Sequence, residues 1–389
     1  MKIMLVAGEA SGDAHAAKLV NALREGFPAI NFEFFGAVSH QLREAGVEQT
    51  VNADDFSIVG LPEITRALPM FWKAFQILKK EAITRKPDAV ILIDFPDFNL
   101  KLAKSLKKEG FKVIYYISPQ LWAWRKYRVK IIKQYVDLLL TILPFEKDWY
   151  AKQNITHVEY VGNPLAKEVY STLSRDEFCK NHNLDSAKAV IALLAGSRHK
   201  EIVRILPVML ETASLMSGKN QDLQFVIALP STRKLTEAET AIAEAQTKGL
   251  KLPKTLITVK NETREALNAS DVAAVTSGTA TLETAIIGTP MTIVYKSSPL
   301  NYKLLRPLIN VEHFGLINLI AQERLAKELI QDDFTGETLA EELFHLLEPE
   351  TNKIMRERLR GVVETLGHGG ASKRAATAIM RELENAKKQ

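Results

Sequence analysis

Short, nearly continuous apolar runs recur along this chain, and segments with helical spacing of apolar residues lie between them. The runs lie at residues 2–7, 88–93, 112–117 and 136–142 in the first half and at 189–194, 223–229, 271–275 and 290–295 in the second. Runs of this length that are apolar on both faces are typical of parallel strands covered by helices on both sides. Two successive series predict an α/β fold with two Rossmann-like, doubly wound domains facing across a cleft.

The length of the chain supports this division, because 389 residues exceed one ordinary domain. We expect domains at 1–164 and 165–365, with a linker near Gly162-Asn163-Pro164, and a final helical segment at 366–389. Helices are expected at 14–24, from Pro144, at 201–216 and from about Thr279. The last helix is expected to follow Gly369-Gly370 with Ser372 as its N-cap.

Composition limits where such a chain can work. The single cysteine, Cys179, excludes an internal disulfide and favours a reducing cytoplasm. The apolar run at the N-terminus stops at Gly8, which is strand length rather than a signal peptide. No uncharged stretch approaches the roughly 20 residues of a membrane span, so any membrane contact is expected to be peripheral.

Positive charge is concentrated in one part of the chain. The net charge is +5, but residues 66–133 contain 16 Lys/Arg against 5 Asp/Glu. This excess indicates an anionic partner for the N-terminal half, with solvated helix faces as the alternative. No nucleic-acid partner is expected.

Ligands of open α/β sheets bind at the carboxyl ends of the strands, so the residues after each strand are the first candidates. The loop after the first strand carries Gly8, Glu9, Ser11, Gly12 and Asp13. Small residues there let a ligand approach the backbone, although a tight strand-to-helix turn would also explain them. The loop matches neither G-x-G-x-x-G nor a P-loop.

Asp94 directly follows the 88–93 strand, where a carboxylate can accept a proton from a substrate hydroxyl. Asp97 has a simpler reading as a helix cap.

A third strand-end loop, at 118–125, is rich in aromatic residues. Trp122, Trp124 and Arg125 could stack on a sugar or hold a phosphate, although a single tryptophan is usually core. Together with Asn99 and Gln120 they are candidates for contact with an acceptor or for lining the cleft.

The second half carries two motifs suited to a diphosphate. Ser197 and Arg198 follow a strand and a glycine, and Ser277, Gly278 and Thr279 open a helix with Glu283 one turn inside. Backbone N–H groups and a guanidinium bind phosphates, and a carboxylate can accept ribose hydroxyls. Histidine, cysteine and acidic residues nowhere have metal-ligand spacing, so no metal or cofactor is expected.

One segment combines apolar residues with the basic region that follows it. Its apolar members are Ile58, Leu61, Leu68, Met70, Phe71 and Trp72. Such a surface inserts shallowly into an anionic leaflet, while the alternative is an ordinary buried helix.

Six blocks of the sequence resemble the lipid A disaccharide synthase family, in the same order. They are VAGEASGD (6–13), IDFPDFN (93–99), YYISPQLWAWR (115–125), LPFEKDWY (143–150), LLAGSR (193–198) and SGTATLE (277–283). The resemblance covers essentially the whole chain and implies a GT-B fold whose C-terminal helix crosses back to the first domain. It makes 1–164 the acceptor- and membrane-facing domain and 165–365 the UDP-sugar domain.

The resemblance also implies a reaction and its residues. UDP-2,3-diacylglucosamine would be the donor and 2,3-diacylglucosamine 1-phosphate the acceptor, with Asp94 as the base of an inverting transfer. Arg198, Ser277, Gly278, Thr279 and Glu283 match UDP-contacting positions, and Asn318 matches an asparagine of the nucleotide pocket. The sequence departs from the family pattern at Ala195, Asn163 and Gln322.

The expected location is the cytoplasm, with peripheral association to the anionic cytoplasmic face of the inner membrane. Oligomeric state stays open, a homodimer being one option. The alternatives are another GT-B enzyme of UDP-GlcNAc, such as a 2-epimerase or a lipid II-type transferase, and a non-catalytic nucleotide sensor at the membrane surface.

Overall fold

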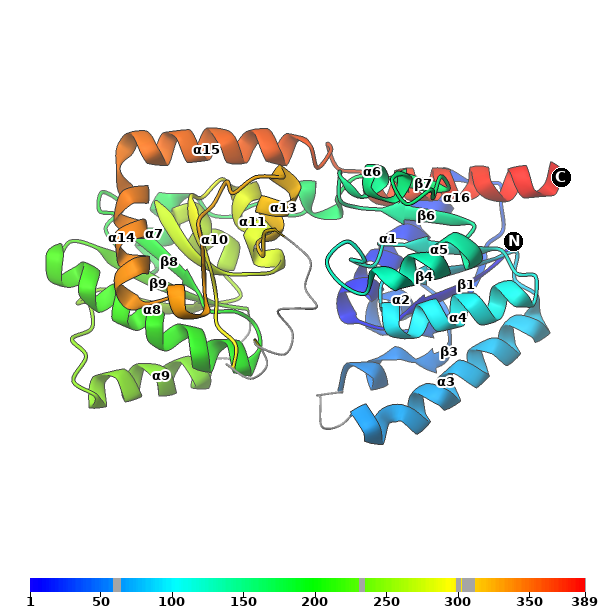
Figure 1. The fold of residues 1–389 in the computed structure, drawn as a ribbon, viewed down its shortest axis with the longest axis horizontal. Coiled ribbons are helices and arrows are strands. Elements are labelled where there is room, and N and C mark those ends of the chain that lie inside the picture. Colours follow the sequence, from blue (N-terminus) through cyan, green and yellow to red (C-terminus); the bar gives the residue numbers. More distant parts are fainter. Residues whose placement is uncertain (59–63, 231–234, 299–301, 303–311, 389) are drawn as a thin grey trace. The chain divides into compact units, whose positions relative to one another are not determined.

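The computed structural model describes residues 1–58, 64–230, 235–298, 302 and 312–388. Backbone contacts divide the chain into two units (Figure 1). Unit 1 comprises residues 1–164 and 368–389, and unit 2 comprises 165–367. Within the described residues, no helix is long and apolar enough to cross a membrane.

Unit 1 is built on a seven-stranded sheet in the order β3-β2-β1-β4-β5-β6-β7, and every pair of neighbours is parallel. The strands are β1 Lys2–Ala7, β2 Glu33–Val38, β3 Glu48–Asn52, β4 Ala89–Ile93, β5 Val113–Tyr116, β6 Leu138–Thr141 and β7 Val158–Tyr160. Their order reverses between β1 and β4, which is where doubly wound sheets bind ligands.

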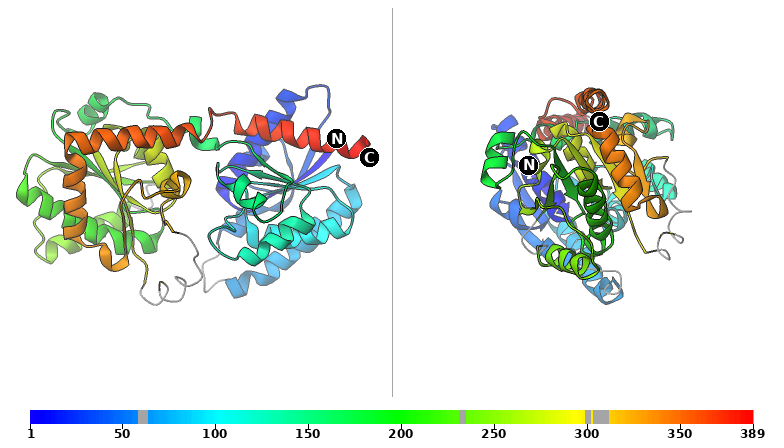
Figure 2. Two further views of the ribbon diagram at one scale, coloured as in Figure 1. Left: turned by 45° about the horizontal axis from the view of Figure 1, so that its top comes forward. Right: turned by 90° about the vertical axis from the view of Figure 1, so that its left-hand side faces the viewer.

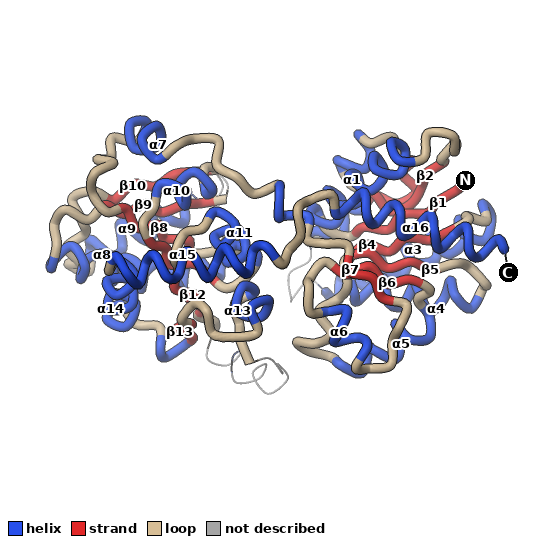
Figure 3. Tube along the Cα trace, turned by 90° about the horizontal axis from the view of Figure 1, so that it is seen from above, coloured by secondary structure: helices blue, strands red, loops and turns tan. Residues whose placement is uncertain are grey.

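Helices cover both faces of this sheet (Figures 1 and 2). They are α1 Ala10–Gly26, α2 His40–Glu44, α3 Ile64–Arg85, α4 Pro96–Lys108, α5 Val129–Tyr135, α6 Glu146–Ala151 and α16 Ala371–Lys388, with 3-10 turns at Ala53–Ile58 and Lys126–Arg128. Side chains of β1 alternate between two cores: Ile3 and Leu5 pack with α1, α2 and α16, whereas Met4 and Val6 pack with α3, α4 and α5. The C-terminal helix α16 therefore completes the core of the first unit, as predicted, and Figure 3 looks onto the face it covers.

Unit 2 repeats the architecture with a six-stranded parallel sheet in the order β10-β9-β8-β11-β12-β13. Its strands are β8 Val190–Leu194, β9 Gln224–Leu229, β10 Leu256–Lys260, β11 Val272–Thr276, β12 Met291–Tyr295 and β13 Glu328–Ile330. Its helices are α7 Arg175–Asn181, α8 His199–Lys219, α9 Leu235–Thr247, α10 Thr263–Ala269, α11 Thr279–Ile287, α13 Leu316–Ala321, α14 Gly336–Leu347 and α15 Pro349–Glu364, with 3-10 turns at Pro164–Lys167 and Gln331–Asp333. Helix α8 packs against α9 and α14, whereas α11 packs against α10, α13 and α15.

The eight apolar runs all form strands, so the prediction of two doubly wound α/β sheets is confirmed. Four helix starts were wrong. Helix α1 begins at Ala10 and takes in most of the loop expected before it, and α6 begins at Glu146 rather than Pro144. Helix α8 begins at His199 rather than at residue 201, and α16 begins at Ala371. Ser372 consequently lies inside the last helix and is not its N-cap. Helix ends are weakly encoded because several neighbouring residues can provide the first turn.

Candidate functional site

Asp94 lies at the carboxyl end of β4, on a sharply turned backbone. Asp94 and Phe95 have φ values of 46° and 50°, a left-handed conformation that is unusual for two consecutive residues other than glycine. The Asp94 carbonyl accepts hydrogen bonds from the Tyr115 hydroxyl (2.6 Å) and Asn99 Nδ2 (2.8 Å), and its N–H donates to the Tyr116 carbonyl (3.1 Å). Strain of this kind persists only where neighbours hold it, and it is common at active sites.

The carboxyl group of Asp94 has an altered acidity. Burial and, to a lesser extent, the negative charge of Glu9 raise its pKa from 3.8 to about 6, although the hydrogen bond from the Phe95 N–H opposes the shift. A carboxyl group with a pKa near 6 is ionised at neutral pH and is a stronger base than an ordinary aspartate. This combination suits general-base catalysis.

The position of the Phe95 ring requires a glycine at residue 8, directly after β1. A Cβ added at Gly8 would overlap that ring, which also stacks on Phe56 at 5.6 Å between centroids. The turn after β1 is thereby packed against the turn that carries Asp94. In this turn Glu9 and Ser11 are exposed, whereas Gly12 is buried.

Asp13 was predicted to belong to the binding loop, but its carboxylate is buried and committed elsewhere. It accepts hydrogen bonds from the N–H groups of Ser39 (2.8 Å), Gln41 (2.8 Å) and Leu42 (3.2 Å). Asp13 therefore anchors the β2–α2 connection.

Asn99 is a second predicted ligand residue that lies inside the unit. It is fully buried, and its Nδ2 donates to the carbonyls of Val6, Ile93 and Asp94. Its place is under the Asp94 turn, where it supports the backbone.

The aromatic loop at 118–125 separates into buried and exposed parts. Trp122 is buried, packs edge-on against Phe145 and donates from Nε1 to Glu146 Oε1 (3.1 Å), so it offers no face to a sugar. Gln120 is exposed, and Trp124 is 39% exposed with the Arg125 guanidinium 4.1 Å from its ring centroid.

Arg125 is already paired with a carboxylate. It binds Asp97 at 2.6 Å, and Arg128 pairs with the same side chain. Asp97 was expected to cap helix α4, but the N-cap position is Phe95 and no side-chain cap bond is made. Asp97 instead ties the start of α4 to the aromatic loop.

In unit 2, the two predicted phosphate motifs line one pocket of about 350 Å³. Its lining includes Ser197 and Arg198 after β8, and Ser277, Gly278, Thr279 and Glu283 around the start of α11. Gly278 has a φ of 146° and open space around it, so the backbone at the helix N-terminus is accessible. The pocket can accept an anion at this end of α11.

The loop that precedes α8 is held by Glu201. Its Oε2 accepts hydrogen bonds from the N–H groups of Ser197 (3.0 Å) and Arg198 (3.1 Å), and Oε1 binds Arg198 Nη1 (3.2 Å). The side chain of Arg198 is 83% exposed and can reach a ligand. Gly196 has a φ of 101°, and a Cβ there would lie 2.5 Å from Glu201 Oε2.

Two further predicted donor residues have partners within unit 2. Glu283 pairs with Arg264 (3.0 Å), and the Ser277 hydroxyl donates to the Phe314 carbonyl (2.7 Å). Asn318 is fully buried: its Nδ2 donates to the Ala326 carbonyl (2.7 Å), and it is not among the described residues that line the pocket.

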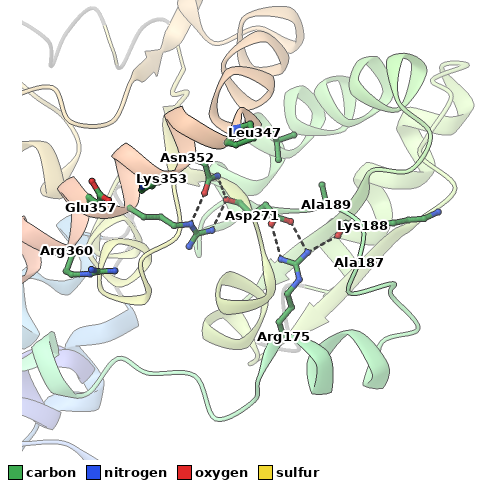
Figure 4. A pocket seen from close by; sticks show the side chains of 12 residues that line it. Arg175, Ala187, Lys188, Ala189, Asp271, Leu347, Asn352, Lys353, Glu357 and Arg360 are labelled. Atoms are coloured by element: carbon green, nitrogen blue, oxygen red, sulfur yellow. Dashed lines mark hydrogen bonds and ion pairs between the residues drawn. The ribbon is translucent and has the colours of Figure 1, made fainter.

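A larger hollow of about 560 Å³ lies at the opposite, amino-terminal ends of β8 and β11 (Figure 4). Asp271 accepts from Arg175 at 3.0 and 3.1 Å, and Arg356 donates to the carbonyls of Asp271 (3.2 Å) and Gly288 (2.8 Å). Gly288 caps the C-terminus of α11. Because these charges bind each other and helix-end carbonyls, we interpret this network as a brace for α11 rather than as the site of chemistry.

Only part of the predicted apolar surface on α3 faces solvent. Leu68 is 56% and Trp72 64% exposed, whereas Met70 and Phe71 pack against the core, with Phe71 stacked on Phe56 at 5.3 Å. Leu61 and the side chain of Ile58 lie outside the described residues. In the described part of the chain, no three His, Cys, Asp or Glu side chains are grouped so that they could hold a metal ion.

Comparison with known proteins assigns the chain to a family. A family model described as lipid-A-disaccharide synthetase matches residues 3–381. The lipid-A-disaccharide synthase of Trichlorobacter lovleyi is 43% identical over 384 residues, 98% of each chain, and that of Syntrophus aciditrophicus is 43% identical over 379 residues, 97% of each chain. The chain belongs to the lipid-A-disaccharide synthase family.

Solved structures with much lower identity share the fold. A UDP-GlcNAc 2-epimerase from Neisseria meningitidis has a TM-score of 0.61 at 14% identity and covers 98% of this chain and 100% of its own. The calicheamicin glycosyltransferase has a TM-score of 0.61 at 14% identity and 98% coverage of both chains. These likenesses confirm the predicted GT-B type of fold.

Several residues around the candidate site were not predicted from the sequence. Glu201, Arg264 and Tyr115 contact the predicted site residues directly, and Glu146 lies under the aromatic loop. Glu201 carried a usable signal, since a glutamate three residues after the N-cap, here Arg198, is half of a capping box. Arg264 and Tyr115 meet their partners only through the tertiary fold.

Proposed function

We propose that this chain joins UDP-2,3-diacylglucosamine to 2,3-diacylglucosamine 1-phosphate, forming the β-1',6-linked disaccharide 1-phosphate and UDP. Membership of the lipid-A-disaccharide synthase family supports this glycosyltransferase reaction, with a nucleotide-sugar donor and a phosphorylated sugar acceptor. The observation that carries the mechanism is Asp94, a strained and partly buried carboxylate at the topological switch point of the first sheet.

The proposed chemistry is one inverting displacement. The 6-hydroxyl oxygen of the acceptor attacks the anomeric carbon of the donor, and its proton passes to Asp94. The bond from that carbon to the diphosphate oxygen breaks, and its electron pair leaves with UDP. The hydrogen bonds from Tyr115 and Asn99 fix the backbone of Asp94 and keep its carboxylate aimed while the proton moves.

The pocket of unit 2 is assigned to the donor. The exposed guanidinium of Arg198 and the N–H groups of 277–279 at the start of α11 would bind the diphosphate and stabilise the charge that develops as UDP leaves. Glu283 would accept the ribose hydroxyls, with Arg264 fixing its carboxylate at 3.0 Å. Asn318 is a secondary candidate, which would act through the Ala326 carbonyl and the Glu328 carboxylate that its Nδ2 binds.

The acceptor is assigned to unit 1. Gln120, Trp124 and Arg125 are the accessible members of the aromatic loop, and Glu9 and Ser11 are the accessible members of the turn after β1. The exposed Leu68 and Trp72, with the lysines of α3, would contact acyl chains and the anionic cytoplasmic face of the inner membrane. A homodimer remains compatible with this assignment.

Turnover of radiolabelled donor, with and without acceptor, tests the proposal. The wild type should form labelled disaccharide and UDP only when both substrates are present, whereas a UDP-GlcNAc 2-epimerase would convert its sugar nucleotide without acceptor. Asp94→Ala should lower kcat by about 10²–10⁴. Its UDP affinity should change less than a few-fold, because Asp94 lies in unit 1 and the donor pocket in unit 2. Near-normal turnover in this variant would remove Asp94 from the mechanism.

A further inference from the structure

A carboxyl group is buried beneath the aromatic loop of unit 1. Glu146, the first residue of α6, is 1% exposed. Its Oε1 accepts from Trp122 Nε1 (3.1 Å), and its Oε2 accepts from the N–H of Leu143 (3.2 Å). One turn later, the Tyr150 hydroxyl is 2.9 Å from Ser118 Oγ. Helix α6 therefore holds the loop both at its start and at its centre.

The surroundings of Glu146 favour its neutral form. Burial raises the pKa of its carboxyl from 4.5 to about 8, and the hydrogen bonds from Trp122 and the nearby backbone oppose the shift only in part. Among the described residues no cation pairs with it. The titratable groups that face it are Tyr150 of α6 and Tyr160 of β7. Burial raises the pKa of both hydroxyls, that of Tyr160 to about 12 even though Arg374 of α16 opposes the shift.

The loop that Glu146 holds carries the exposed side chains assigned to the acceptor. In the sequence, Trp122 lies between Gln120 on one side and Trp124 and Arg125 on the other, so we expect a displacement of its buried indole to displace these neighbours through the backbone. Neither Glu146 nor Trp122 is placed to touch substrate. Any effect of Glu146 on the reaction must act through the loop.

We propose that Glu146 is a positioning residue for acceptor binding, and that it works as a neutral carboxyl group that accepts the indole hydrogen bond of Trp122. The proposal rests on the assignment of the loop to the acceptor. Ionisation of Glu146 at alkaline pH places an unpaired charge among apolar side chains. The loop then shifts or admits water, and the acceptor is held less well, while the donor pocket of unit 2 is unaffected.

The test compares Glu146→Gln with the wild type between pH 6.5 and 9.5. Glutamine keeps a carbonyl oxygen for Trp122 but cannot ionise. In the wild type, kcat/KM for the acceptor should fall about tenfold from pH 7 to pH 9, mainly through KM. The Gln variant should stay within about twofold of the wild type at pH 7 and lose this fall. Asp148→Asn, an exposed site on the same helix, is the matched control and should keep it.

Tryptophan fluorescence tests the proposal in proteins that keep Glu146. The emission of Trp122, obtained as the difference between the wild type and Trp122→Phe, should change with a midpoint near pH 8. No such change in the wild type, or an unchanged alkaline fall in a folded Glu146→Gln variant, would overturn the proposal. A fluorescence change without any change in acceptor KM would also overturn it. If the wild type had no turnover with both substrates, the proposed function would fail, and the positioning role with it.

Discussion

Asp94→Asn should make unit 1 more stable at neutral pH while it removes catalysis. The carboxyl group has a pKa of about 6 in the folded chain, against 3.8 as its ordinary value, so the folded state holds the proton more tightly than the unfolded state. Above pH 6 the group is ionised in both states, and folding must bear the full cost of ionising it where water is largely excluded. Below about pH 3 it is protonated in both states, and the cost disappears.

The size of the effect follows from the two pKa values. Each pKa unit corresponds to about 1.36 kcal/mol, so the difference between 3.8 and about 6 lowers the free energy of unfolding at pH 7 by about 3 kcal/mol at most. Asparagine has nearly the same shape, cannot ionise and can still accept the hydrogen bond from the Phe95 N–H. For a unit of this size the gain should raise Tm by roughly 5–10 °C.

Unit 1 can be followed by itself, because all four tryptophans of the chain (72, 122, 124 and 149) lie within residues 1–164. Urea unfolding monitored by tryptophan fluorescence should show the largest gain for Asp94→Asn at pH 7, a smaller one at pH 5 and almost none at pH 3.5. The same substitution at the exposed Asp148 is the control and should show no such pH dependence. A variant that is no more stable at pH 7, or whose gain is the same at pH 3.5, would refute this account of the Asp94 environment.

Four further changes test other parts of the two units. Glu9→Gln should move the acid limb of the activity profile to lower pH, because the charge of Glu9 raises the pKa of Asp94; an unmoved limb contradicts that coupling. Gly8→Ala should lower the free energy of unfolding in urea by about 1–3 kcal/mol and lower kcat, because its Cβ meets the Phe95 ring. Gly26→Ala is the control and should be tolerated, since a Cβ there has nothing within 4 Å. Arg198→Ala should weaken UDP binding about 10–100-fold in calorimetry, and Arg198→Lys should restore it in part. Arg204→Ala, in helix α8, is the control and should have little effect, and unchanged binding in Arg198→Ala would exclude contact with the diphosphate. The double substitution Leu68→Ser and Trp72→Ser should reduce binding to anionic vesicles in sedimentation without altering the melting curve, whereas the control Tyr170→Ser on unit 2 should bind as the wild type does. Equal binding by the wild type, the double variant and the control would exclude the α3 surface as the membrane contact.

The strands and the positions of the motifs could be predicted from the sequence, because the signal for them is local. A parallel strand buried on both faces must be apolar along its whole length, so 88–93 and 189–194 could be identified without the fold. Since ligands bind at the carboxyl ends of such strands, Asp94, Arg198 and 277–279 could be selected as well. The C-terminal helix on unit 1 was implied by the family resemblance, and its packing with α1 confirms it.

Only the tertiary structure decided which polar and aromatic residues of these motifs face outward. Asp13, Asn99 and Trp122 belong to the same short blocks as Ser11, Asp94 and Trp124, yet they are buried and bonded to groups up to 93 residues away. The α3 segment shows the same division, with Trp72 exposed and Phe71 stacked in the core. A carboxylate, an amide or an indole has the same hydrogen-bonding capacity toward a ligand as toward a distant backbone group, so residue type alone cannot distinguish the two. The environment decides, and for Asp94 and Glu146 it also sets the charge, because the solvation of each carboxyl depends on every element that packs around it.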